Sequence, residues 1–108
     1  MISIHVNRGN SYAICAKGHA GGEQGKDIVC SAVSSLIQNI LIGLESLSVD
    51  WKCSMEHGNI NIVLKRDYNE DLEKAIFLME TTVKSLKEIT ASYSDRLQVM
   101  ENSTDEIV

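Results

Sequence analysis

Two pairs of segments in this chain alternate apolar and polar residues. They are residues 2–6 with 12–16, and residues 51–57 with 60–64. A period of two is typical of half-buried strands. A Gly-Asn dipeptide separates the two segments of each pair, at Gly9-Asn10 and at Gly58-Asn59. Because glycine and asparagine tolerate the positive φ angles of tight turns, the pattern predicts two antiparallel hairpins.

Two longer segments repeat their apolar residues every three or four positions, which is typical of helices packed on one side. The first covers residues 28–47 and the second covers about residues 69–92. Asp27 is placed to cap the first helix, because its carboxylate can accept from backbone N–H groups two or three residues later. Leu97 and Val99 predict a short final strand.

This order of elements predicts an α+β fold: a two-layer sandwich, ββαββα plus a short terminal strand. The sheet is expected to be mostly antiparallel, with both helices on one face. We expect a single domain over residues 1–101 and a frayed tail over 102–108. The alternating side chains of Trp51, Cys53 and Met55 form a moderately apolar surface. The sheet face away from the helices must be solvated or covered by a partner, and we assign these side chains to that face, so a homodimer is expected.

Composition narrows the possible functions. The chain has 108 residues, a net charge of −5, and 15 acidic against 10 basic side chains. An acidic balance argues against direct nucleic-acid binding and suits a basic partner. Residues 28–47 carry too many polar side chains for the membrane span that their length would allow. Three widely spaced cysteines and an N-terminus unlike a signal peptide predict a cytoplasmic protein whose cysteines are thiols.

One pairing of residue types suggests catalysis. His19 lies in a glycine-rich segment, residues 18–25, and Cys30 lies in the first turn of the first predicted helix. The positive end of a helix stabilises a thiolate, and a neighbouring histidine can take the thiol proton. Together they would form a nucleophile–base pair, with helix-start N–H groups as an oxyanion hole. The alternative is ordinary: an inert half-buried cysteine and a solvated histidine.

Two nearby residues have two interpretations each. Asp27 either only caps the helix or also orients protonated His19, the third role in a triad. Ser34 lies one turn after Cys30 on the same helix face. Its hydroxyl either donates to the Cys30 carbonyl or lines the substrate site.

The remaining candidates indicate structure rather than chemistry. We expect Cys15 and Cys53 to be core thiols, and His5 and His57 to lie on strands. These residues lack the spacing of zinc ligands, so we expect no metal and no cofactor. The charged face of the second helix is expected to be solvated. Core or dimer packing is the expected role of three methionines, Met55, Met79 and Met100.

A longer motif surrounds the histidine and the cysteine. It reads Gly18-His19-Ala20-Gly21, then Gly25-Lys26-Asp27-Ile28-Val29-Cys30-Ser31-Ala32-Val33-Ser34. This motif resembles the signature of the ribosomal-processing cysteine protease Prp family, and the resemblance extends over nearly the whole chain.

The resemblance implies a dimeric endopeptidase. Its substrate would be the N-terminal extension of a bacterial large-subunit ribosomal protein, number twenty-seven, cut after an aromatic pair in a short apolar motif. By the same resemblance His19 matches the catalytic histidine and Cys30 the nucleophile. Gly18, Gly21, Asp27 and Ser34 would support the site or bind substrate. The histidine and the cysteine are eleven positions apart, one fewer than is usual in the family, which leaves the preferred cleavage sequence open.

Two other classes of function fit the same residues. One is a non-catalytic module that binds a ribosomal protein. The other is a thiol redox sensor that uses Cys30, although no resolving cysteine lies near it in the sequence. Cleavage of a peptide separates the protease from both.

Overall fold

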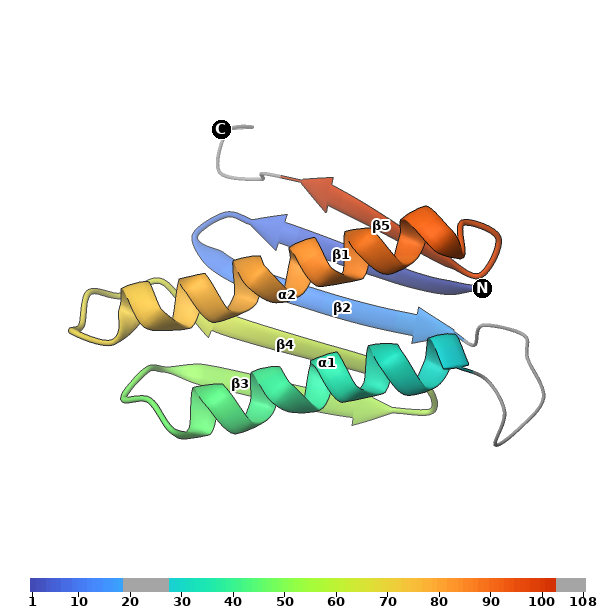
Figure 1. Cartoon of the computed structure of the whole chain (residues 1–108). Coiled ribbons are helices and arrows are strands. Elements are labelled where there is room, and N and C mark those ends of the chain that lie inside the picture. The colour runs from blue at the N-terminus through green and yellow to red at the C-terminus, as the bar shows by residue number, and fades with distance from the viewer. Residues whose placement is uncertain (19–27, 103–108) are drawn as a thin grey trace.

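The structure is a computed structural model that describes residues 1–18 and 28–102. Its elements follow the predicted order and confirm the α+β sandwich (Figure 1). They are β1 (Ile2–Arg8), β2 (Ser11–Gly18), α1 (Ile28–Glu45), β3 (Trp51–Glu56), β4 (Asn59–Lys65), α2 (Leu72–Ser92) and β5 (Leu97–Asn102). Asn102, which we predicted to begin the tail, is the last residue of β5.

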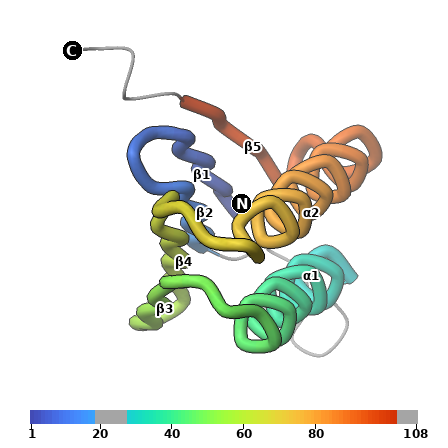
Figure 2. Tube along the Cα trace, turned by 90° about the vertical axis from the view of Figure 1, so that its left-hand side faces the viewer, coloured from blue at the N-terminus to red at the C-terminus, as the bar shows by residue number. Residues whose placement is uncertain are grey.

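The five strands form one sheet in the order β3-β4-β2-β1-β5. Neighbouring strands are antiparallel except β1 and β5, which are parallel. The parallel pair arises because α2 carries the chain from β4 across the sheet to its far edge. Both helices cover the same face of the sheet, so the molecule has two layers (Figure 2).

The core lies between the helices and the sheet. Alternate residues of β1 and β2 are buried, and their neighbours point to the opposite face. The helices contribute one buried stripe each, spaced by three or four residues as one side of a helix requires. The stripe of α1 is Val29, Val33, Ile37, Ile40 and Leu44, and that of α2 is Ala75, Met79, Thr82, Val83 and Leu86.

Helix α1 is long and apolar enough, by length and composition, to cross a membrane, contrary to our expectation from its polar residues. A core helix passes the same test, and the buried stripe of α1 packs on the sheet. The helix also ends earlier than predicted, at Glu45. The Ser46 amide and hydroxyl both donate to the Ile42 carbonyl, and the Leu47 amide donates to the carbonyl of Leu44, so the chain turns away there.

Our assignment of the Trp51, Cys53 and Met55 side chains to an open sheet face is wrong. Trp51 pairs with Leu64 and Cys53 with Ile62, and both partners are fully buried under the helices. Directly opposite residues point to the same side of a sheet, so these side chains face the helix layer. Alternation along an isolated strand identifies two faces but not which of them is covered.

The open face carries different residues from those predicted. Its middle row includes His5 and Cys15, which are cross-strand partners, and Asn61, which pairs with Cys15. The expectation that Cys15 is a core thiol is therefore wrong, whereas Cys53 does pack against the core. A homodimer stays a prediction, without the apolar surface that suggested it.

The second hairpin turns one residue earlier than predicted. Glu56 pairs with Asn59, so the turn consists of His57 and Gly58. Both have positive φ, 34° for His57 and 79° for Gly58, as the primed turns of two-residue hairpins require. His57 is thus a turn residue and not a strand residue.

Candidate functional site

Cys30 is the third residue of α1, and its half-buried side chain lines a cavity of about 410 Å³. The cavity lies where β2 ends, α1 begins and the β3–β4 hairpin turns. A volume of this size is typical of ligand pockets. The structure therefore places the predicted nucleophile at an accessible hollow and not in the packed core.

Helix α1 supplies one wall of this cavity. Cys30 and Ser34 both line it, one turn apart, and Ser34 is exposed. Val33 and Ile37 line it as well and are nearly buried, so this wall becomes apolar toward the core. The structure thus places Cys30 and Ser34 on the same face of α1, as the sequence predicted, and this face borders the cavity.

Gly18 lies at the end of β2 and also lines the cavity. Its φ is +93°, and a Cβ atom at this position would stand 2.5 Å from the Met1 carbonyl oxygen. A glycine is therefore required by the backbone itself, whatever role Gly18 has toward substrate. Ile2 and Ala16, both buried, complete an apolar floor between the strands and the helix.

The hairpin supplies the opposite wall, which the sequence analysis missed. Met55, Glu56, His57, Asn59 and Ile60 all line the cavity. We interpreted Met55 as a residue of the core or of a dimer interface and His57 as a strand residue, because alternation continues through both. A signal was present in the His-Gly dipeptide, since histidine is among the residues that tolerate positive φ.

His19, Gly21 and Asp27 lie outside the described residues, so their roles stay predictions. Helix α1 begins at Ile28, directly after Asp27. That boundary agrees with the predicted position of a capping residue.

Burial raises the pKa of the Cys53 thiol, which favours its neutral form. Within residues 1–18 and 28–102, no group of three or more histidine, cysteine, aspartate or glutamate side chains could hold a metal ion.

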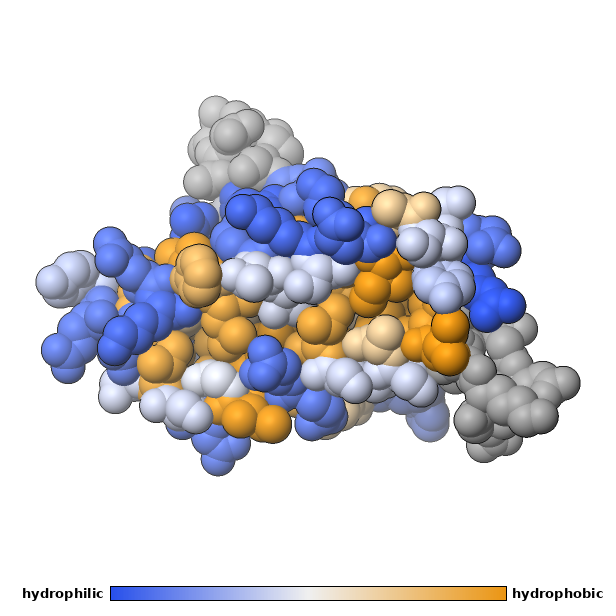
Figure 3. All heavy atoms as spheres, in the orientation of Figure 1, coloured by the Kyte–Doolittle hydropathy of each residue, from blue (hydrophilic) through white to orange (hydrophobic). Residues whose placement is uncertain are grey.

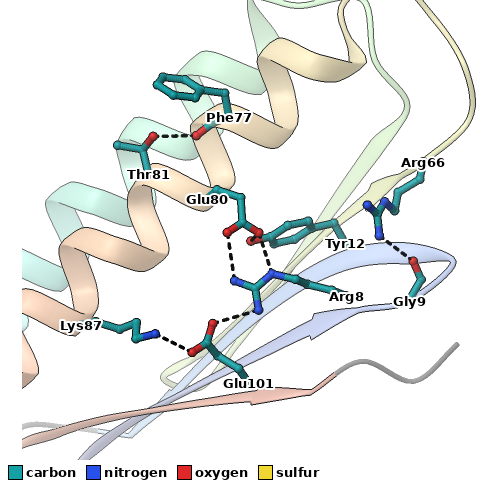
Figure 4. Close-up of polar contacts among 9 residues, drawn as sticks. All are labelled: Arg8, Gly9, Tyr12, Arg66, Phe77, Glu80, Thr81, Lys87 and Glu101. Carbon is teal, nitrogen blue, oxygen red and sulfur yellow. Dashed lines mark hydrogen bonds and ion pairs between the residues drawn. The ribbon is translucent and has the colours of Figure 1, made fainter. Parts of the chain in front are cut away.

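A polar network lies at the other end of the sheet and corrects our expectation that the charged face of α2 is simply solvated (Figure 4). Glu80 of α2 accepts from Arg8 Nε at 2.6 Å and from the Tyr12 hydroxyl at 2.5 Å. Arg8 also contacts Glu101 at 2.9 Å, and Glu101 accepts from Lys87 at 2.8 Å. The network joins β1, β2, α2 and β5.

The network shifts the titration of its members. The hydrogen bond from Arg8 lowers the pKa of Glu80, and that from Tyr12 lowers it further. Burial raises the pKa of Tyr12, and its hydrogen bond to Glu80 acts in the same direction. Glu80 is thus a partly buried carboxylate held by Arg8 and Tyr12, and not a fully solvated charge.

A thiol at the start of a helix, beside an open cavity with an apolar floor, is placed where a cysteine nucleophile could reach a bound substrate. The profile of the family described as cysteine protease Prp matches residues 1–98. The chain belongs to this family, which confirms the resemblance in its motif and makes the protein a cysteine protease.

Solved structures support the fold. The Staphylococcus aureus ribosomal processing protease Prp, bound to a covalently linked product peptide, has a TM-score of 0.82 at 21% identity and covers 94% of this chain and 100% of its own. The same S. aureus protease with a substrate peptide has a TM-score of 0.75 at 20% identity and covers 94% of this chain and 100% of its own. SMU.848 from Streptococcus mutans has a TM-score of 0.72 at 25% identity and covers 96% of this chain and 99% of its own. No curated protein matches the chain.

Proposed function

We propose that this protein is an endopeptidase that removes the N-terminal extension of a bacterial large-subunit ribosomal protein, number twenty-seven. The observation that carries the proposal is the position of Cys30, at the start of α1 and on the cavity, within a chain of the Prp family. The similar S. aureus protease is a ribosomal processing enzyme with structures bound to substrate and product peptides, which supports a peptide substrate here.

In the proposed mechanism, His19 takes the Cys30 thiol proton, and the thiolate attacks the scissile carbonyl. The positive end of α1 stabilises both the thiolate and the oxyanion that develops next. The C–N bond then breaks, and His19 returns the proton to the leaving amine. Water hydrolyses the thioester and regenerates the thiol. In this proposal Asp27, which lies outside the described residues, either only caps α1 or also orients protonated His19.

Ser34 and Gly18 line the same cavity as Cys30, so we assign them to substrate binding. Gly21 belongs with them by its place in the family motif. The chain carries a net charge of −5, which favours approach of a basic ribosomal protein. The cytoplasmic location, the homodimer and the lack of direct contact with nucleic acid are further parts of this proposal.

The test uses a synthetic peptide with the sequence of the host protein's N-terminal extension. It is incubated with the wild type, with Cys30→Ala and with Cys15→Ala, and the products are analysed by mass spectrometry. Cys15 is the matched control, because it is a half-buried cysteine on the open sheet face. We expect a single cut by the wild type and by Cys15→Ala, and none by Cys30→Ala.

Each other result has a definite meaning. Cleavage by Cys30→Ala would show that the nucleophile is wrong. A tight complex of wild type with uncut peptide would indicate a binding module in place of a protease.

A further inference from the structure

The cavity wall that faces Cys30 is the tip of the β3–β4 hairpin. Cys30, Ser34 and Gln38 line the cavity from α1, and Met55, Glu56 and His57 line it from the hairpin. The cavity is therefore bounded by a helix that carries the nucleophile and by a hairpin with no assigned role.

Met55 is unusual for its position in the sheet. Its strand partner Ile60 and the preceding residues of its row, Cys53 and Trp51, are at least partly buried under the helix layer. Met55 faces the same side but is 66% exposed. The helix layer therefore leaves the hairpin tip uncovered, and a flexible thioether stands on the cavity rim. Methionine adapts to apolar groups of different shapes.

His57 has a backbone conformation that few side chains adopt. Among the residues that the structure describes, it is the only non-glycine with positive φ. Its position in the two-residue turn favours asparagine, aspartate or glycine. A strained backbone at a cavity is a common mark of a functional residue. Here the turn places His57 on the rim of the cavity that Cys30 also lines.

The three positive-φ residues within positions 1–18 and 28–102 are Gly18, His57 and Gly58, and all of them line this cavity. The unusual backbone of the described chain is thus concentrated around one hollow. This concentration is expected where the backbone shapes a binding site.

We propose that the hairpin tip is the specificity-determining wall of the protease, a proposal that rests on the function proposed above. Met55 contacts a bulky apolar side chain of an extended peptide substrate, and His57 hydrogen-bonds the peptide beside it. The apolar floor of Ile2, Ala16 and Ile37 receives the same side chain. The hairpin binds and orients the peptide, and Cys30 performs the chemistry.

The experiment measures kcat and KM for a quenched fluorescent peptide of the extension sequence. Met55→Lys places a charge on the apolar rim, so KM should rise about tenfold while kcat changes less than about twofold, as expected when an interaction is made equally in the ground and transition states. Met100→Lys is the matched control, because Met100 is an exposed methionine of β5 that pairs with His5 on the open face. It should leave both constants unchanged.

His57→Asn tests the second residue without disturbing the turn, because asparagine is favoured at this position. We expect unchanged or increased thermal stability and a KM about threefold to tenfold higher. A rise in KM without loss of stability would not follow from a purely structural role.

An alanine scan of the peptide locates the contact. At one apolar position of the peptide, replacement by alanine should lower kcat/KM about tenfold for the wild type but less than about threefold for Met55→Ala. The reason is that the peptide substitution and the Met55 substitution remove the same contact. Equal losses of kcat/KM at every peptide position in both enzymes would overturn the proposal. The proposal would also fail if Met55→Lys and His57→Asn had the same kcat and KM as Met100→Lys. If the wild type cuts no peptide at all, the proposed function itself fails, and this inference fails with it.

Discussion

The two ends of the sheet are built in opposite ways. At one end, Arg8, Tyr12, Glu80 and Glu101 join three strands to α2 through hydrogen bonds and ion pairs. At the other end, the helix layer leaves the hairpin tip uncovered, and a cavity separates Met55 and His57 from Cys30. Polar contacts close the first end, whereas positive-φ residues and an exposed methionine border the second.

This difference suggests that the two ends of this small domain have different roles: one end stabilises the fold, and the other stays open to substrate. A chain of this size has one core, and contacts that close a cavity would stabilise the fold but exclude a substrate. The network end supplies stability without touching the cavity. The cavity end can therefore keep an accessible thiol and a strained turn. Substitutions at the two ends should accordingly separate activity from stability.

The largest expected effect is on activity at the cavity end. Cys30→Ala should lower kcat/KM by at least about a thousandfold, because it removes the nucleophile. The free energy of unfolding should change by less than about 1 kcal/mol, since the side chain is only half-buried. Peptide cleavage and urea denaturation measure the two quantities on the same sample. A large loss of stability would contradict the proposed difference in roles.

Gly18→Ala should give the largest effect on stability, and it is the exception at the cavity end because the constraint at Gly18 lies in its backbone and not in side-chain contacts. The new Cβ would stand 2.5 Å from the Met1 carbonyl oxygen in a backbone with φ of +93°. We expect a loss of about 2–3 kcal/mol, measured by urea denaturation.

Gly43→Ala is the matched control for Gly18→Ala. Its Cβ would meet the flexible end of the Leu78 side chain, where α1 and α2 approach each other. Apolar residues gather along the line between these helices (Figure 3). Because Leu78 can shift and alanine favours a helix, the change should stay within about 1 kcal/mol. Similar losses at both glycines would show that the backbone of Gly18 is not special.

The sequence predicted the parts of this molecule that depend on local patterns. Alternation and helical spacing identified every element, and the predicted helix start placed Cys30 in the first turn of α1. The β1–β5 pairing was not predictable, because its partners, such as Ile2 and Leu97, are 95 positions apart in the sequence. The hairpin wall was missed because Met55 and His57 continue a strand pattern. Only the tertiary arrangement reveals that α1 leaves them uncovered.

The network was missed for a related reason. Glu80 lies on the charged side of α2, where helical spacing predicts a solvated carboxylate. It contacts Arg8 and Tyr12, which are 72 and 68 positions away in the sequence. A contact of this range has no local signature.

Glu80→Gln tests how much the network stabilises the other end. It replaces a carboxylate that accepts from Arg8 and Tyr12, so we expect a loss of about 1–2 kcal/mol at neutral pH, given that the side chain remains about one-third exposed. Activity per folded molecule should stay the same. Urea denaturation at several pH values provides the measurement.

The pH dependence follows from the lowered pKa of Glu80. Its pKa in the unfolded chain is near 4.5, and the folded value is lower because Arg8 and Tyr12 stabilise the carboxylate. The stabilisation is therefore fully present above pH 4.5 and is lost as pH falls through the folded pKa. Glu80→Gln should show a weaker loss of stability on acidification than the wild type. An identical slope would mean that Glu80 does not contribute.

Lys87→Met should have the smallest effect of the series. Lys87 donates to Glu101 at 2.8 Å, but its side chain is 55% exposed, and Glu101 keeps its contact with Arg8. Exposed ion pairs contribute little, so we expect a loss of at most about 0.5 kcal/mol. The difference from the wild type should shrink further in 1 M salt, where the Debye length is about 3 Å. If Lys87→Met lost as much unfolding free energy as Glu80→Gln, the contact at the β5 edge would be the main stabilising contact of this end of the sheet. The contact of Glu80 with β1 and β2 would then not be.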